Sequence, residues 1–274
     1  MSMVNKTDIR EAIHGQTVIV HGDCWPEMTA VQHVVQAIHP ESSCEVTGSL
    51  TDLLRFLART PDALLILCLR PGEHIYLFYA LKEVLLDHPA LVISDELFFS
   101  DRLVLQSWGG LPFTSLRDII PLIRAIQKDD PPPLPPKGEL SRFLSAPTVA
   151  TGFFAVPMIF NSPERLMNYM SLLLHRAITY CGITPAQQKL LNEIYKGKST
   201  LSGMARMMGM SGKKISQEKE RILTKLGMNN RIHALLHGTR FCPEIQRTAF
   251  ITPDEIRFHS SPGVVHAISK ENIT

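Results

Sequence analysis

Five prolines within the six residues 131–136 divide this chain of 274 residues into two parts. Proline fixes its backbone φ angle and has no amide hydrogen, so the run cannot form a helix or a central strand. Such runs are extended and semi-rigid, and are typical of spacers between domains; a ligand for a proline-binding module is the alternative. We therefore predict a first domain over 1–128, a proline-rich linker over 129–160, a helical linker and second domain over 161–240, and a tail of unknown role over 241–274.

Ahead of the proline run, short apolar segments alternate with helical patterns. The apolar segments predict strands over 17–20, 63–69 and 90–94, and the spacing of apolar residues predicts helices over 26–38, 50–58, 75–86 and 116–126. The run 63–69 is apolar at every position, which is typical of a strand buried on both faces. This alternation predicts a doubly wound α/β domain, in which helices cover both faces of a parallel sheet.

The formal net charge of +2 conceals a strong segregation along the chain. Between residues 176 and 240 there are twelve lysines and arginines against three glutamates, a net charge of +9, and the remainder therefore carries −7. A basic segment on an acidic protein suggests a polyanionic partner for that segment. The alternative is a solvated helical face without a partner.

The composition argues against several other classes of protein. Hydrophobic residues make up 45% and charged residues 20%, as in globular proteins, and no apolar run reaches the roughly 18 residues of a membrane span. Five scattered cysteines without a C-x-x-C pair argue against a disulfide scaffold or a zinc site. There is no glycine-rich phosphate loop and no nucleophile elbow. We expect a reduced, cytoplasmic protein that is not an enzyme and uses no membrane, metal or cofactor.

After the linker the patterns are helical. Ser162 and Thr184 each precede a proline, which is typical of helix starts. Helices are therefore predicted from 163 to about 180 and from 185 to about 195, with Gly197 ending the second.

Two further helical patterns, joined by a glycine, lie inside the basic segment. Ala205 is small enough for a second helix to cross close to it, and Gly209 tolerates a left-handed turn. Ile215 would pack back on the first helix, and the second helix is predicted to run from the capping residue Ser211 to about Leu226. Its exposed face is predicted to carry Lys214, Gln217, Glu218, Arg221 and Lys225. A basic exposed helix of this kind suits the major groove of DNA.

Three short motifs occur here in order: Ile183-Thr184-Pro185, the Lys213-Lys214-Ile215 element within 211–216, and the closing Lys225-Leu226-Gly227-Met228-Asn229-Asn230-Arg231. Together they resemble the LuxR-type helix-turn-helix domain of bacterial regulators. The element from Ile215 to Lys219 is especially similar to that of the Rcs capsule regulator and its auxiliary partners.

The LuxR resemblance implies a four-helix domain whose second and third helices recognise DNA and whose fourth, about 231–237, is available for dimer contact. It places base contacts at Ser216, Gln217 and Glu220. It places contacts with the DNA backbone at Lys213, Lys214, Lys219, Arg221 and Lys225. The chain departs from the family at Gln187-Gln188, where an acidic residue is usual, in the stretch 198–204, which is one residue longer, and at Glu220, where lysine is common. Glutamate can accept a hydrogen bond from cytosine, but it also repels phosphate.

The first domain resembles, more weakly, the receiver domain of response regulators. Residues 18–23 are similar to the first strand with its acidic pair, of which Asp23 remains, and residues 61–72 to the third strand and its following turn. The resemblance places the phospho-accepting position at Leu67, the switch hydroxyl at Ser94 and the fifth-strand lysine near Thr114. A receiver needs carboxylates for Mg²⁺, a nucleophilic aspartate and that lysine. We therefore predict a pseudo-receiver that accepts no phosphate and acts through protein contacts.

These features together predict a phosphorylation-independent bacterial transcription regulator that binds double-stranded promoter DNA. It would act as a homodimer, or as a heterodimer with an Rcs-type or other response regulator. The alternative is a protein-interaction module that modulates another regulator and binds little DNA itself. Glu218 and Glu220 on the recognition helix favour this alternative.

Overall fold

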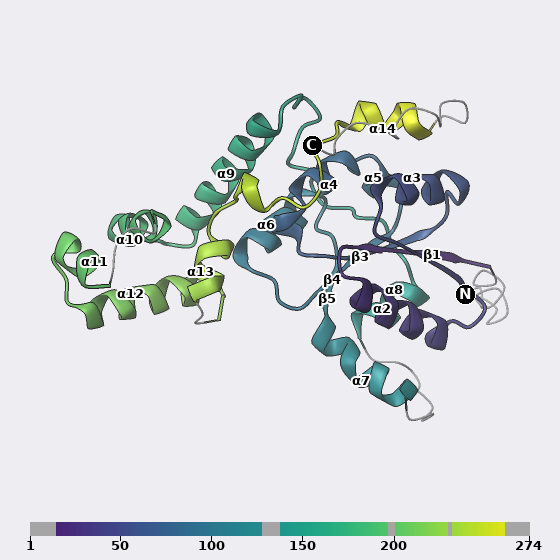
Figure 1. Ribbon diagram of the computed structural model, residues 1–274, viewed down its shortest axis with the longest axis horizontal. Helices are drawn as coiled ribbons and strands as arrows, with labels where there is room; N and C mark the ends of the chain where they lie inside the picture. The colour runs from purple at the N-terminus through teal and green to yellow at the C-terminus, as the bar shows by residue number, and fades with distance from the viewer. Residues whose placement is uncertain (1–14, 128–137, 197–200, 230–231, 261–274) are drawn as a thin grey trace, which may run out of the picture.

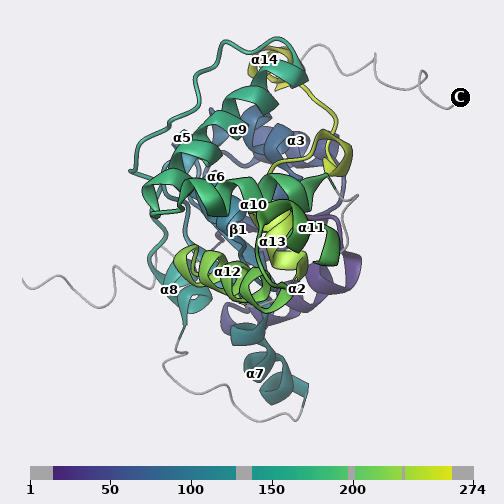
Figure 2. The same ribbon diagram turned by 90° about the vertical axis from the view of Figure 1, so that its left-hand side faces the viewer.

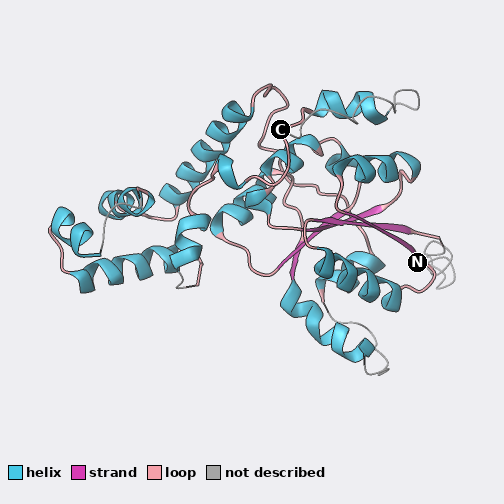
Figure 3. Cartoon of the chain, in the orientation of Figure 1, coloured by secondary structure: helices cyan, strands magenta, loops and turns pink. Residues whose placement is uncertain are grey.

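The computed structural model describes residues 15–127, 138–196, 201–229 and 232–260. A sheet flanked by helices forms one end of the molecule and a group of helices forms the other (Figures 1 and 3). Seen from the helical end, this second group lies in front of the sheet domain (Figure 2). Across the described residues, no helix is long and apolar enough to cross a membrane.

The sheet has five strands, all parallel, in the order β2-β1-β3-β4-β5. The strands are β1 (Thr17–Gly22), β2 (Ser43–Thr47), β3 (Leu64–Cys68), β4 (Ala90–Ser94) and β5 (Phe113–Ser115). In the central register, Ile19 of β1 pairs with Glu45 of β2 and with Leu65 of β3. The doubly wound α/β fold predicted for the first domain is confirmed.

Strand β3 illustrates why its sequence is apolar throughout. Leu64, Ile66 and Cys68 face the layer formed by α2 (Trp25–Ile38), α7 (Leu116–Gln127) and α8 (Glu139–Ser145). Leu65 and Leu67 face the opposite layer, formed by α3 (Leu50–Arg59), α4 (Ile75–Ala80) and α6 (Phe99–Ser107). Because successive side chains of a strand alternate between its faces, a strand covered on both sides must be apolar at every position.

Several elements differ from the sequence prediction. The apolar patterns predicted neither edge strand, because β2 alternates exposed and partly buried residues and β5 is only three residues long. Only the receiver resemblance, which places a fifth strand near Thr114, anticipated β5. Helix α6 was also missed; its first turn is polar, and Asp101 caps it by accepting from the backbone N–H of Phe98 at 2.8 Å. The helix predicted over 75–86 is divided into α4 and α5 (Val84–Asp87), and a short 3-10 turn, η1 (Pro71–Glu73), precedes it.

The linker predicted over 129–160 needs correction in its second half. The proline run lies outside the described residues, but α8 places Leu140, Phe143 and Leu144 in the core beneath the sheet. The following segment also packs on the sheet domain, where Phe154 pairs with Trp108 in an isolated bridge and Val156 is buried. Residues 139–160 therefore belong to the sheet domain, because their apolar side chains cover surface that it would otherwise expose.

The helical end comprises α9 (Pro163–Tyr180), α10 (Pro185–Tyr195), α11 (Leu201–Met208), α12 (Gly212–Lys225) and α13 (Ile232–Gly238). The predicted helix starts are confirmed: the hydroxyls of Ser162, Thr184 and Ser211 each accept from a backbone N–H of the first turn. The predicted helix end at Gly197 lies outside the described residues.

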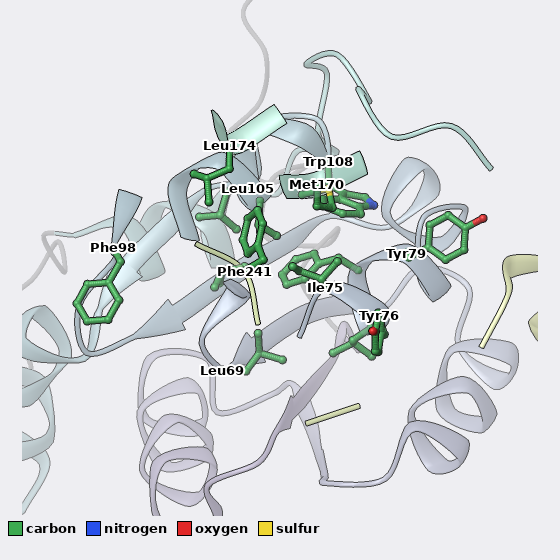
Figure 4. Close-up of a cluster of buried hydrophobic side chains, with 14 of the residues drawn as sticks. Leu69, Ile75, Tyr76, Tyr79, Phe98, Leu105, Trp108, Met170, Leu174 and Phe241 are labelled. Carbon is green, nitrogen blue, oxygen red and sulfur yellow. The ribbon is translucent and has the colours of Figure 1, made fainter. Parts of the chain in front are cut away.

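The two ends of the molecule share one continuous hydrophobic core. Met170 and Leu174 of α9 lie beside Leu105 and Trp108 of the sheet domain, and Phe241 joins them after α13 (Figure 4). Beyond Phe241 the chain returns to the sheet domain through the 3-10 turn η2 (Pro243–Ile245) and helix α14 (Pro253–Ser260) (Figure 1). The tail thus contributes to the core.

Candidate nucleic-acid interface

Helices α11 and α12 cross at a tight turn whose residues are those expected from the sequence. Ala205 is buried at the crossing, and the N–H of Met210 donates to its carbonyl at 2.8 Å. Gly209 has a φ of +62°, a left-handed conformation that residues with a Cβ rarely adopt. Ile215 of α12 is fully buried against the rest of the domain. Helices α11 and α12 are in contact, with the small residue, the left-handed glycine and the buried isoleucine at the positions expected for a helix–turn–helix.

Helix α12 has one buried face and one fully solvated face. The buried face consists of Ile215, Ile222 and Leu223, with Leu226 directly after the helix. Side chains three and four residues apart lie on the same side of a helix, so the opposite side carries a stripe of exposed residues: Lys213, Gln217, Glu220 and Thr224. Ser216, Lys214 and Arg221 flank this stripe and are exposed as well. We define the outer face of α12 as these seven residues.

Two of the residues predicted to contact the DNA backbone do not belong to the outer face. Lys219 is partly buried on the side of the helix that faces the domain. Lys225 is exposed, but its ammonium group donates to the carbonyl of Gly182 at 2.6 Å and to the amide oxygen of Gln187 at 2.9 Å. These contacts direct Lys225 toward the N-terminus of α10 and away from the stripe.

Glu218 was predicted on the exposed face and is instead partly buried between α12 and α10. One of its carboxylate oxygens accepts from the amide of Gln187 at 2.8 Å, and the other pairs with Arg221. The hydrogen bond from Gln187 is the main reason that the pKa of Glu218 is lowered. Its carboxylate is therefore held between Gln187 and Arg221, beside the exposed stripe, which leaves Glu220 as the acidic residue within that stripe.

The helical end docks on the sheet domain through the opposite end of α12. The guanidinium of Arg102 on α6 donates to the carbonyls of Leu226 and Gly227 just after α12, and the hydroxyl of Ser100 donates to the carbonyl of His237 at 3.0 Å. Helix α13 contacts α6, and its Leu235 is fully buried. Ala234 and Leu235 of α13 are thus buried within the chain, whereas the N-terminal half of α12 stays open.

The positions corresponding to the receiver's phosphorylation site lie at the carboxyl ends of the strands. Leu67 is fully buried in β3, and Ser94 and Thr114 are buried in β4 and β5. Asp23, directly after β1, pairs with His74 at 3.4 Å and with Arg247. The hydrogen bond from His74, helped by the charge of Arg247, lowers the pKa of Asp23 to about 2. Within the described ranges, His, Cys, Asp and Glu form no group of three or more suited to a metal ion.

Sequence reasoning missed the part of this region that comes from the tail. Arg247 and Gln246 contact the loop after β3, and Phe250 packs on the tyrosines of α4. No periodicity or motif marks these residues, and they lie more than 170 positions from their partners.

Comparisons with known proteins gave structural similarities alone. No protein-family model matches the chain, and no curated protein matches it by sequence. A structure of the two-component response regulator RcsB in complex with DNA is 18% identical over 81% of this chain and 96% of the other, with a TM-score of 0.43. RcsB from Salmonella enterica serovar Typhimurium bound to promoter rprA aligns with 17% identity over 82% and 98%, at a TM-score of 0.42.

Full-length FixJ from B. japonicum aligns at 10% identity over 81% of this chain and 94% of the other, with a TM-score of 0.30. All three TM-scores are below 0.5, so these alignments are too weak to carry a functional assignment. The function of the chain has to follow from its own residues.

Proposed function

We propose that the chain is a DNA-binding transcription regulator in which α12 enters the major groove and the sheet domain acts without accepting phosphate. The observation that carries this proposal is the outer face of α12, where basic and polar side chains are solvated on a rigid helix with a buried opposite side. An α-helix fits the major groove, and this combination of residues supplies both phosphate contacts and base contacts.

The roles of the individual residues follow from their positions. Lys213 and Lys214, in the first turn of α12, would neutralise phosphates. Arg221, which is exposed but paired with Glu218, would have to exchange that carboxylate for a phosphate. Ser216, Gln217 and Glu220 would face base edges, where Gln217 can pair with adenine and Glu220 can accept from cytosine. Lys219 and Lys225 receive no direct role, because the first is partly buried and the second is bonded to Gly182 and Gln187.

Phosphorylation independence is proposed from the side chains at the receiver positions. Leu67 has no group that could accept a phosphoryl, and Asp23 is paired with a histidine and an arginine of the same chain. We further propose that the protein acts as a homodimer or as a heterodimer with an Rcs-type regulator. It is not expected to catalyse a reaction.

The test is DNA binding by Lys213→Ala/Lys214→Ala against genomic promoter fragments. Removing two phosphate contacts should weaken binding to all sequences about tenfold or more near physiological salt and lower the salt slope by about 2. The matched control is Arg165→Ala/Arg176→Ala, which removes two exposed positive charges from α9. Equal binding by the wild type and both double variants would overturn the proposal.

A second candidate function is an interaction module that modulates another regulator. Its support is Glu220, which lies in the middle of the exposed stripe and would repel phosphate. Capture of a partner regulator by the full-length protein, without measurable DNA binding at physiological salt, would favour this function over the first.

A further inference from the structure

The segment 241–256, which we call the C-terminal strap, lies against the sheet domain near the carboxyl ends of β1 and β3. Arg247 forms ion pairs with Asp23, just after β1, and with Glu73 of η1 at 2.8 Å, just after β3. Its backbone N–H also donates to the carbonyl of Glu73 at 2.9 Å. One residue of the tail thus joins the loops that follow two adjacent strands.

This position is the switch point of the sheet. From β1 the chain goes to β2 on one side, whereas β3, β4 and β5 follow on the other side. Loops leaving β1 and β3 therefore separate, and open α/β sheets bind ligands in the crevice between them. In this protein the group bound at that position is the guanidinium of Arg247 from the same chain.

The residues flanking Arg247 are bound with comparable specificity. The side-chain amide of Gln246 accepts from the N–H of Ile75 and donates to the carbonyl of Gly72, each at 2.9 Å. Thr248 bonds to His74 at 3.0 Å. The ring of Phe250 stacks on Tyr79 with 5.8 Å between centroids and meets Tyr76 edge-on at 5.5 Å.

The loop held by the strap also holds α6. The N–H of Gly72 donates to the buried carboxylate of Asp101 at 2.7 Å, and Asp101 caps the N-terminus of α6. The two neighbours of Asp101 in α6 contact the helical end: Ser100 binds α13, and Arg102 binds the end of α12. A continuous series of polar contacts therefore connects the strap with the docking surface of the helical end.

We propose that the carboxyl-end crevice of the sheet is a peptide-binding site whose ligand is residues 246–250 of the same chain, recognised through Arg247, Gln246 and Phe250. Occupancy of this site keeps the loop 71–74 and α6 in the arrangement that docks α12 and α13. The occupant is the strap of the same copy, because the chain runs without a gap from α13 through the buried Phe241 to Arg247. Any effect of strap docking on DNA binding by α12 rests on the proposed function, whereas occupancy of the crevice by the strap does not.

Hydrogen–deuterium exchange on the full-length protein without DNA tests the proposal. Arg247→Glu places a third carboxylate beside Asp23 and Glu73, so amide exchange over 72–76 and 243–250 should rise at least tenfold. Exchange over β3 should stay unchanged, which shows that the sheet remains folded. Gln246→Ala should raise exchange in the same two segments without any change of charge. Arg124→Glu on α7, which is exposed and distant from the crevice, is the matched control.

A charge exchange sharpens the test. Asp23→Arg/Arg247→Asp reverses the pair, and it should restore protection in both segments to within about threefold of the wild type. Unchanged exchange in Arg247→Glu and Gln246→Ala would overturn the proposal. So would protection that falls on dilution, because the occupant would then be a second copy of the chain. DNA affinity of the same variants is measured separately, so a failure of strap docking is distinguishable from a failure of DNA binding.

Discussion

Two basic parts of this chain use positive charge in opposite ways. Lys213 and Lys214 are exposed at the open end of α12, whereas Arg247 of the strap lies between Asp23 and Glu73 and pairs with both. An exposed lysine remains available to an external anion, but a guanidinium that bridges two carboxylates already has its anions in the same chain. The net charge of a segment therefore indicates a polyanionic partner only where the fold leaves the cations without internal partners.

The largest effect that we predict is a change in the stability of the sheet domain. Leu67→Asp would place a carboxylate at the position where a receiver has its phospho-acceptor. Leu67 is fully buried in the core between the sheet and α3, α4 and α6, and an unpaired buried charge is strongly unfavourable. We expect the free energy of unfolding to fall by about 3 kcal/mol or more, measured by urea unfolding.

The control for that substitution is Leu67→Met, which conserves volume and should lower the free energy of unfolding by less than about 1.5 kcal/mol. A stably folded Leu67→Asp protein that takes up phosphate from a small phosphodonor would contradict our view of the site. It would mean that one substitution reopens the region that the strap and core side chains close.

Acid should weaken the sheet domain through the buried His21. His21 is buried at the end of β1, with Nδ1 2.9 Å from the carbonyl of Thr47. Burial, together with the neighbouring charge of His74, lowers the pKa of His21 to about 4, although the Thr47 carbonyl and Asp23 act in the opposite direction. His21 is thus neutral in the folded protein at neutral pH.

Because the unfolded chain binds this proton more tightly, the stabilising contribution of a neutral His21 is complete above pH 6.5 and is lost as the pH falls toward 4. The loss is at most about 3 kcal/mol. Urea unfolding at pH 7 and pH 4.5 measures it. His21→Asn, which can still donate to Thr47, should flatten the pH dependence between these values. The pKa of Asp23 is lowered to about 2, so the stability that it contributes is lost only below pH 4.

The parts predicted from the sequence are those whose causes are local. The strand over 63–69 follows from an apolar residue at every position, and the start of α12 follows from the hydroxyl of Ser211 three residues before Lys214. Ala205, Gly209 and Ile215 were found because a helix crossing constrains residue size and backbone φ within ten positions. Such rules operate over one or two turns of chain.

The missed parts depend on contacts between distant residues. Glu218 was predicted to be exposed but is partly buried, because the side-chain amide of Gln187, 31 residues away, donates a hydrogen bond to it. The contacts of the strap could not be predicted from the sequence, because Arg247 pairs with Asp23, 224 residues away. Isolated polar side chains in an irregular segment also show no helical or strand periodicity. Residues 139–160 were assigned to a linker because the surface that they cover is formed by strands and helices elsewhere in the chain.

The smallest predicted effect concerns the one acidic residue of the exposed stripe. Glu220→Gln removes a negative charge from the middle of the outer face and leaves the fold unchanged, because the side chain is exposed. If α12 enters the major groove, binding to non-specific DNA should tighten about threefold to tenfold at physiological salt, since phosphate repulsion is removed. Fluorescence anisotropy with a labelled duplex measures this.

Glu164→Gln on α9 is the matched control for Glu220→Gln, because it removes an exposed negative charge from outside the outer face of α12. Its effect on DNA affinity should be smaller than that of Glu220→Gln. On a promoter that places a cytosine against residue 220, Glu220→Gln should instead weaken binding. Glutamate accepts a hydrogen bond from cytosine N4 more strongly than a neutral amide does. If Glu220→Gln changes binding to no duplex, the outer face does not contact DNA, and the open lysines of α12 either contact an acidic protein surface or face solvent alone.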